Sequence, residues 1–237
     1  MNKVKEAAYK YFKEFSIVDR YNVSWQAIFN KIDLNEDIFI LSIRPKIDYD
    51  LNHVNSTFHA QWGSDLASKV SRLPLDKPVY VYCDTGQLSS QAVVLLRLLG
   101  IDAYSIYEGF TNAQIYRCKK YLEIDSHAFK GEEKDFDLDV LNFVKKYLNE
   151  ESQNQSYIIK AKTVKQVIEN KDVCILDIRR DLDFNKSHID LAIHIPFEKG
   201  MQMRFSEIPH KKVIIACYSG QTSGQTVVIL RALGFDA

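Results

Sequence analysis

The sequence lacks several features that would place it in a whole class of proteins. Lys and Arg together number 31, and Asp and Glu also number 31, so the formal net charge at pH 7 is zero. This balance argues against a basic surface for nucleic acid and against general attraction to acidic membranes. No apolar run reaches about 18 residues, close to the length that a spanning helix needs. We therefore expect partners that are neither nucleic acid nor membrane.

The chain also lacks the cysteine spacing of a metal site and the pattern of a secretion signal. Its four cysteines form no CxxC pair and no metal-ligand cluster: Cys83, Cys118, Cys174 and Cys217. Residues 1–15 are mixed in charge and helical in period, without a continuous apolar core. We expect free thiols in a reducing cytoplasm. No metal or organic cofactor is implied, and the oligomeric state stays open.

What the chain does contain is sufficient for packed cores. Hydrophobic residues make up 46% and aromatic residues 12%, which argues against global disorder. A chain of 237 residues is long enough for one large domain or for two of about 100 residues each.

An internal repeat favours two domains. Residues 79–103 align without a gap with residues 213–237, at an offset of 134 (217 minus 83). Upstream, residues 39–54 match residues 174–189 at an offset of 135 (179 minus 44). A helical segment precedes each copy, at 4–15 and at 138–150.

Each copy alternates helices with apolar strands. A short helix (24–32; 163–170) precedes an apolar strand (37–43; 173–178), and a polar stretch leads to a second strand (78–82; 212–216). A loop and an apolar helix that stops at a glycine follow (89–100; 223–234). This alternation is typical of an α/β fold with a mostly parallel sheet covered by helices on both faces.

The repeat suggests a division of the chain into an N-terminal helix (1–20), a first domain (21–125), a linker with a helix (126–156) and a second domain (157–237). The polar, irregular stretch 150–156 is predicted to mark the junction. The acidic stretch 131–139 reads as a solvated face. The second copy stops at Ala237, equivalent to Ala103, whereas residues 104–124 should add a strand and a helix to the first. We therefore expect an incomplete second domain, in a fragment or in the native chain.

In each copy a cysteine ends a strand and a helix begins shortly afterwards. Ligand sites in parallel sheets lie at the carboxyl ends of the strands. A helix start offers free N–H groups and the positive end of its dipole, which stabilise a thiolate, a persulfide or a bound sulfur oxyanion. Gly86 and Gly220, three residues after Cys83 and Cys217, allow the loop to curl with its N–H groups inward.

A single cysteine at a strand end is usually a small buried hydrophobe. Here two cysteines occupy equivalent places before the same x-x-Gly-Gln and a helix, which favours a functional role for Cys83 and Cys217. Cys118, in a basic helical stretch, and Cys174, inside an apolar strand, are interpreted as structural or incidental.

Both copies resemble the rhodanese family of sulfurtransferases, whose catalytic loop runs C-x-x-G-x-[R/T]. The second loop, CYSGQT, fits at Cys217, Gly220 and Thr222, whereas the first, CDTGQL, ends in Leu88, which donates no hydrogen bond. The upstream family pattern, roughly LLDVR, then an acid–aromatic pair and GHIPGAINIP, is matched well by residues 175–196. The first copy departs from it, with Ser42 in place of the aspartate. The resemblance implies two rhodanese-like domains, the second truncated at its C-terminal end.

If the resemblance holds, Cys217 or Cys83 attacks the outer sulfur of a donor such as thiosulfate and passes it, as a persulfide, to a thiol or cyanide acceptor. The implied partners are a small sulfur donor and a thiol acceptor, which can be a protein. The loops are expected to cradle the charge through their N–H groups. They comprise Tyr218, Ser219, Gly220, Gln221 and Thr222 after Cys217, and Asp84, Thr85, Gly86, Gln87 and Leu88 after Cys83.

Several neighbours allow two interpretations. Thr222 is either a hydroxyl donor to the sulfur or a helix N-cap. Gln221 and Gln225 are four residues apart and either face the loop together or are ordinary exposed polar residues. Asp84 is expected to raise the pKa of the adjacent thiol and to repel an anionic donor. Four further side chains are assigned to the scaffold: Arg44, Arg179, His53 and His188.

Two other functions compete with sulfur transfer. A cysteine-loop phosphatase needs an arginine six residues after the cysteine to bind phosphate, and Ser89 and Ser223 stand there instead. A non-catalytic binding or regulatory module is the stronger alternative, because Asp84 and Leu88 depart from the active pattern and a fold does not fix function.

Overall fold

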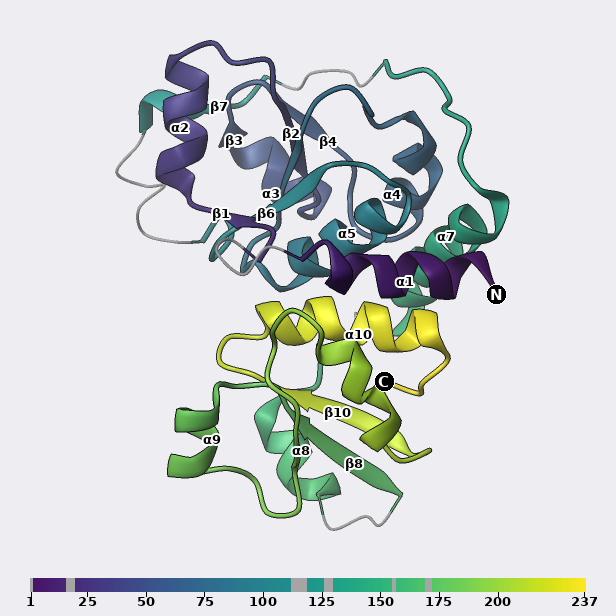
Figure 1. Ribbon diagram of the computed structural model, residues 1–237. Coiled ribbons are helices and arrows are strands. Elements are labelled where there is room, and N and C mark those ends of the chain that lie inside the picture. Colours follow the sequence, from purple (N-terminus) through teal and green to yellow (C-terminus); the bar gives the residue numbers. More distant parts are fainter. Residues whose placement is uncertain (1, 16–19, 112–118, 126–129, 155–156, 169–171) are drawn as a thin grey trace.

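The chain folds into two α/β lobes, described by a computed structural model over residues 2–15, 20–111, 119–125, 130–154, 157–168 and 172–237 (Figure 1). The first lobe comprises the described residues between 20 and 125, and the second comprises those between 157 and 237. A layer of helices lies between the two lobes, including the yellow helix α10 and the dark purple helix α1. In the part of the chain that is described, no helix is long and apolar enough to cross a membrane.

The first lobe contains a five-stranded parallel sheet in the order β1-β6-β5-β2-β4. The strands span Asn22–Val23 (β1), Phe39–Ser42 (β2), Thr57–His59 (β4), Val79–Tyr82 (β5) and Ala103–Ile106 (β6). Successive side chains of a strand point to opposite faces. On β5, Val79 and Val81 join one hydrophobic cluster, while Tyr80 and Tyr82 join another. The prediction of a sheet buried on both faces is thus confirmed for the first copy.

Helices and a small ladder complete the first lobe. The helices span Trp25–Asp33 (α2), Lys46–Leu51 (α3), Ser64–Lys69 (α4) and Gln87–Leu98 (α5), with short 3-10 turns at Val70–Arg72 (η1) and Lys119–Tyr121 (η2). Strands His53–Val54 (β3) and Leu122–Glu123 (β7) pair antiparallel. The strand predicted after Ala103 is β6; most of the residues expected to form the following helix lie outside the described ranges.

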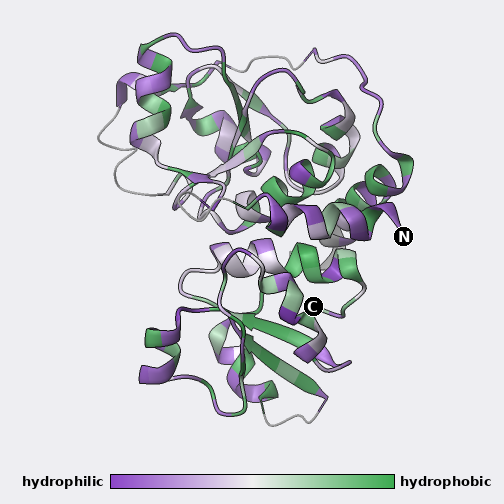
Figure 2. Cartoon of the chain, viewed as in Figure 1, coloured by the Kyte–Doolittle hydropathy of each residue, from purple (hydrophilic) through white to green (hydrophobic). Residues whose placement is uncertain are grey.

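The second lobe repeats this plan with a three-stranded parallel sheet in the order β10-β8-β9. Its elements are Ala161–Val167 (α8), Val173–Asp177 (β8), Asp181–Lys186 (α9), Ile193–His194 (β9), Met201–Glu207 (η3), Lys212–Ala216 (β10) and Gln221–Leu233 (α10). Both β8 and β10 are strongly hydrophobic (Figure 2). β5 lies between two neighbouring strands, whereas among the described residues its equivalent β10 pairs only with β8. The expected smaller second sheet is therefore confirmed.

The two lobes join through equivalent helices, because α5 packs directly against α10. The close approach is visible at Gly224 of α10, where an added Cβ would stand 3.0 Å from the carbonyl oxygen of Gln87. Both helices are apolar over most of their surface, and most of their residues are buried. Burial on nearly all sides is expected for a helix that is covered by its own sheet and by the other lobe.

The two helices that precede the copies are exchanged between the lobes. In α1 (Lys3–Lys13), Tyr11 donates a hydrogen bond to Gln225 of α10 (3.0 Å), in the second lobe. In α7 (Leu138–Asn154), Tyr147 donates one to Gln91 of α5 (2.7 Å), in the first lobe. Gln91 and Gln225 are equivalent positions of the repeat. Each leading helix thus binds the copy that it does not precede, and α1 also packs against α5 of the first copy.

The irregular structure predicted for 150–156 is wrong over most of its length, because α7 continues to Asn154, whereas the position of this stretch at the junction between the copies stays a prediction. The i to i−4 hydrogen bonds of a long helix extend it through polar residues as readily as through apolar ones. The acidic stretch 131–139 is mostly exposed and irregular before α7 begins, as expected. The domain boundaries themselves stay predictions.

Candidate functional site

Each candidate cysteine lies directly after a strand of its sheet: β5, in the middle of the first sheet, and β10, at one end of the second. Cys83 follows β5 and Cys217 follows β10, and the helices α5 and α10 begin four residues later, at Gln87 and Gln221. Gly86 and Gly220 precede the helices with φ of 86° and 88°. A left-handed residue at this point turns the chain sharply from strand to helix. Neither cysteine lies inside a strand, so both loops retain the geometry that the sequence predicts.

The Cys217 sulfur is surrounded by hydrogen-bond donors of its own loop. The Gly220 N–H donates to Sγ over 3.1 Å, and Sγ lies 3.3 Å from the hydroxyl of Ser223. Burial by itself raises the pKa of the Cys217 thiol. Hydrogen bonds from Ser223, Thr222 and Gly220 outweigh this effect and hold the pKa below its ordinary value. The loop therefore favours the thiolate, the reactive form of cysteine.

Cys83 has similar donors but a different environment. The N–H groups of Gly86 and Ser89 donate to its sulfur over 3.1 and 3.4 Å, and the hydroxyl of Ser89 is 3.6 Å away. Only 2% of Cys83 is exposed, whereas Cys217 is intermediate in exposure. The two sulfurs therefore differ in access more than in the donors that surround them.

A large apolar cavity opens beside Cys217. Its volume is about 880 Å³, and Cys217, Gly220 and Ser223 lie on its wall together with residues from β10, α8 and α10. Among its lining residues are Ile159, Val164, Ile175, Ile214, Ile215 and Val227. A cavity of this size, mostly apolar with a few polar groups at one end, is typical of a small-molecule site.

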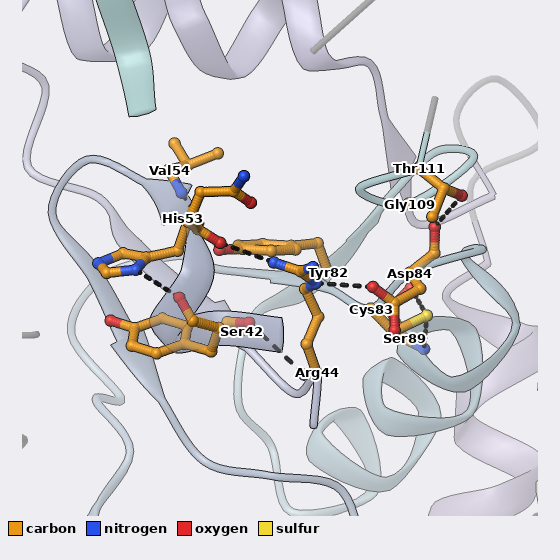
Figure 3. A network of polar contacts seen from close by, with 12 residues as sticks. Ser42, Arg44, His53, Val54, Tyr82, Cys83, Asp84, Ser89, Gly109 and Thr111 are labelled. Atoms are coloured by element: carbon orange, nitrogen blue, oxygen red, sulfur yellow. Dashed lines mark hydrogen bonds and ion pairs between the residues drawn. The ribbon is translucent and has the colours of Figure 1, made fainter. Parts of the chain in front are cut away.

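Asp84, next to Cys83, forms an ion pair with Arg44 (Figure 3). Arg44 Nε lies 2.7 Å from Asp84 Oδ1, and Nη1 donates to the carbonyl oxygen of Asn52. The Asp84 carbonyl oxygen accepts hydrogen bonds from the N–H and hydroxyl of Thr111. The carboxylate expected to repel anions is thus neutralised by a nearly buried guanidinium, and the loop is fixed from both sides.

The equivalent arginine of the second copy pairs differently. Arg179 donates to both carboxylate oxygens of Asp177, at the end of β8. In the loop, Tyr218 instead donates a short hydrogen bond to Asp183. This bond, with Arg180 beside it, holds the pKa of Asp183 below its ordinary range. Arg44, Arg179, His53 and His188 all bond to neighbouring carboxylates or carbonyls, as expected of scaffold residues.

The loop glutamines do not surround their own cysteines. Gln87 donates to the carbonyl oxygen of Ser219 in the other lobe (3.0 Å). Gln221 is 4% exposed and lies against Gly86, and Gln225 is fully buried, bound to Tyr11 and Arg20. Both readings of the Gln221–Gln225 pair, facing their own loop or solvent-exposed, are therefore wrong. Each glutamine instead spans the junction between the lobes or binds an exchanged segment.

Thr222 lies inside the first turn of α10. The N-cap of this helix is Gly220, so Thr222 does not cap it. Its hydroxyl contributes to lowering the pKa of Cys217, in line with a donor role. The corresponding Leu88 packs on the hydrophobic core of the first lobe. Thr85, Tyr218 and Ser219 are exposed on the loops.

The serines six residues after each cysteine contribute to the sites, although the sequence pattern marks them only as positions that lack an arginine. Ser89 and Ser223 each contact the sulfur of their own loop. Their identity in both copies at the same spacing is the signal that would have found them. Cys174 is buried inside β8, as predicted, and burial raises the pKa of its thiol. Cys118 lies outside the described residues.

Comparison with known proteins identifies one family. The rhodanese-like domain profile matches residues 26–115 and 160–237, which together make up most of the chain. No curated protein sequence matches the chain. Among solved structures, SseA of Escherichia coli, described as a 3-mercaptopyruvate sulfotransferase, is 17% identical; the match covers 92% of this chain and 98% of that one, with a TM-score of 0.45.

Two further structures show similarly low identity. A rhodanese-related protein of Thermoplasma volcanium is 20% identical over 44% of this chain and 98% of its own, with a TM-score of 0.38. A thiosulfate sulfurtransferase of Pseudomonas aeruginosa is 13% identical over 99% of this chain and 45% of its own, with a TM-score of 0.37.

Proposed function

Because the chain belongs to the rhodanese-like family, we propose that it is a sulfurtransferase that carries sulfane sulfur as a persulfide on Cys217. The observation that carries this proposal is the position of the Cys217 sulfur. It accepts a hydrogen bond from the Gly220 N–H at 3.1 Å and lies on the wall of the 880 Å³ cavity. A thiolate stabilised at the edge of an open cavity is suited to attack a bound sulfur donor.

The proposed reaction has two steps that balance. The Cys217 thiolate attacks the outer sulfur of thiosulfate, the S–S bond of the donor breaks, and sulfite leaves with its electron pair. The enzyme then holds Cys–S–S⁻. A cyanide ion or a thiolate attacks the terminal sulfur in the second step, forming thiocyanate or a new persulfide and releasing the Cys217 thiolate. No oxidant or reductant is consumed.

The loop is built to hold negative charge during both steps. The N–H group of Gly220 points at the cysteine sulfur, and the hydroxyls of Thr222 and Ser223 belong to the same first turn of α10. Fixed donors of this kind stabilise developing charge without reorganisation. The apolar cavity supports a small donor or acceptor with an apolar portion, and a thiol protein can reach the exposed Tyr218–Ser219 side of the loop.

A second role, that of a non-catalytic binding or regulatory module, is proposed for the first copy. Cys83 is 2% exposed, and the Asp84 carboxylate beside it is engaged by Arg44. Leu88 packs into the core where the family pattern has a donor. Sulfur donors cannot reach a thiol that is buried in this way. The first copy would then bind and position the second copy and would not transfer sulfur itself.

The proposal is tested by the intact mass of the protein after incubation with thiosulfate, followed by cyanide. The parent is expected to gain the mass of one sulfur atom, which cyanide then removes. Cys217→Ser is expected to abolish the gain, whereas Cys83→Ser and the control Cys174→Ser should retain it.

Two outcomes would contradict the proposal. A gain that persists in Cys217→Ser and disappears in Cys83→Ser would move the chemistry to the first lobe. Absence of any gain in a folded parent, with thiosulfate and also with 3-mercaptopyruvate as donor, would favour a binding module for the whole chain.

A further inference from the structure

The Cys217 loop is held by a side chain from the other copy. Gln87, the first residue of α5, reaches across the junction between the lobes, and its Nε2 donates to the carbonyl oxygen of Ser219 over 3.0 Å. The same side chain lies over Gly220, where an added Cβ would stand 2.3 Å from Nε2 and 2.8 Å from Cδ of Gln87. Gln87 therefore fixes the peptide group between Ser219 and Gly220.

That peptide group carries the donor to the reactive sulfur. In a planar trans peptide the C=O of one residue and the N–H of the next point in opposite directions. When Gln87 holds the Ser219 carbonyl on one side, the Gly220 N–H must point to the other, where Cys217 Sγ lies 3.1 Å away. A hydrogen bond to the carbonyl also polarises the amide, which strengthens the N–H as a donor.

We propose that Gln87 is a positioning residue for Cys217: by binding the Ser219 carbonyl, it aims the Gly220 N–H at the sulfur and so stabilises the thiolate and the persulfide. The first copy, whose own cysteine is closed off, thereby serves the site of the second. This inference rests on the proposed role of Cys217, but the thiolate itself can be measured without any sulfur donor.

Other charged groups lie near the site and stay unchanged when Gln87 is replaced. Arg20 of the first lobe lines a smaller pocket together with Tyr218 and Thr222. Lys165 of α8 and Lys212 of β10 line the cavity. Asp183 and Arg180 gather around the Tyr218 hydroxyl on the opposite side of the loop. A change in the titration of Cys217 on replacing Gln87 therefore reports on the amide contact.

The test is the pH dependence of alkylation of Cys217 by iodoacetamide in the full chain, followed by mass spectrometry of its peptide. Gln87→Met keeps the length of the side chain and removes its donor. Gln26→Met is the matched control, since Gln26 is an exposed residue of α2 bound only locally to Asn30. Cys174, buried in β8 of the same lobe, serves as the internal reference for loosening of the fold.

Gln87→Met is expected to weaken the hydrogen bond from the Gly220 N–H to the Cys217 thiolate. The alkylation midpoint of Cys217 should then rise by about one pH unit, since a hydrogen bond to a charged group contributes on that order. At pH 7 the rate should fall about threefold to tenfold, because higher thiol basicity partly offsets the smaller thiolate fraction. Gln26→Met and the Cys174 peptide should not change.

An unchanged midpoint in a variant with native circular dichroism would overturn the proposal, and so would a parallel change at Cys174, which would indicate general loosening. Should Gln87→Met fail to fold, Gln87→Asn, whose amide is too short to reach Ser219, gives the same decision. If the parent forms no persulfide but the midpoint still moves, the positioning role stands and the sulfurtransferase proposal fails.

Discussion

The guanidinium of Arg44 and the carboxylate of Asp84 lie 2.7 Å apart beside Cys83, whereas the equivalent Arg179 is paired with Asp177 on its own strand. The difference follows from the residues at two equivalent positions. Ser42 stands where the second copy has Asp177, so Arg44 has no carboxylate at the end of its strand. Asp84 stands where the second copy has Tyr218, so the arginine of the first copy finds its carboxylate in the cysteine loop.

We expect Asp84→Asn to lower the free energy of unfolding by about 1–3 kcal/mol, because a guanidinium that is 7% exposed loses its carboxylate. Urea denaturation measures the change, and Asp76→Asn, at an exposed position, is the control. Equal stability of the two variants would show that the pair contributes nothing.

Comparison of Gly220→Ala with Gly200→Ala separates the effect of backbone strain from the effect of the contact between Gly220 and Gln87. Both glycines have a φ near 90°, so each alanine should cost about 1–2 kcal/mol of stability. A Cβ at Gly200 meets nothing within 4 Å, but at Gly220 it would collide with Gln87. Only Gly220→Ala should therefore also slow alkylation of Cys217, as peptide mass spectrometry can measure. Equal rates of Cys217 alkylation in the two variants would contradict a role for the contact between Gly220 and Gln87.

The exchanged helices should couple the two lobes. Tyr11→Phe leaves the buried Gln225 amide oxygen without the hydroxyl of Tyr11, and we expect a loss of about 1–2 kcal/mol in the free energy of unfolding. Tyr147→Phe should act similarly through Gln91. Denaturation by urea, with Tyr9→Phe at an exposed position of α1 as control, measures both. A cost no larger than that of the control would argue against the coupling.

The pH dependence of the thiols follows from their surroundings. The Cys217 pKa lies below its ordinary value and that of Cys174 above, so the thiolate of Cys217 forms first as the pH rises. Alkylation of Cys217 should therefore reach half its maximal rate at a lower pH than that of Cys174. Ser223→Ala should move the Cys217 midpoint upward by about one unit, as the loss of one bond to a charged group implies. Ser89→Ala, in the other loop, is the control and should leave it unchanged.

The sequence alone predicts the repeat, the strand-loop-helix order and the two cysteine loops. They depend on local signals: apolar strands, a glycine at the turn, and an identical pattern in both copies at a fixed offset. For the same reason Cys83, Cys217 and the buried Cys174 stand where the sequence predicts.

The way in which the two copies meet depends on long-range packing, which the sequence pattern does not predict. Packing of α5 on α10 brings Gln87 to Ser219 and buries Gln221 and Gln225, residues that look like ordinary polar positions of a helix. The exchange of α1 and α7, the pairing of Arg44 with Asp84 and the different exposure of the two cysteines belong to the same level. These contacts join residues that are 40 to 214 positions apart in the sequence. Periodicity and motif spacing describe only a few turns of chain, so they do not predict such contacts.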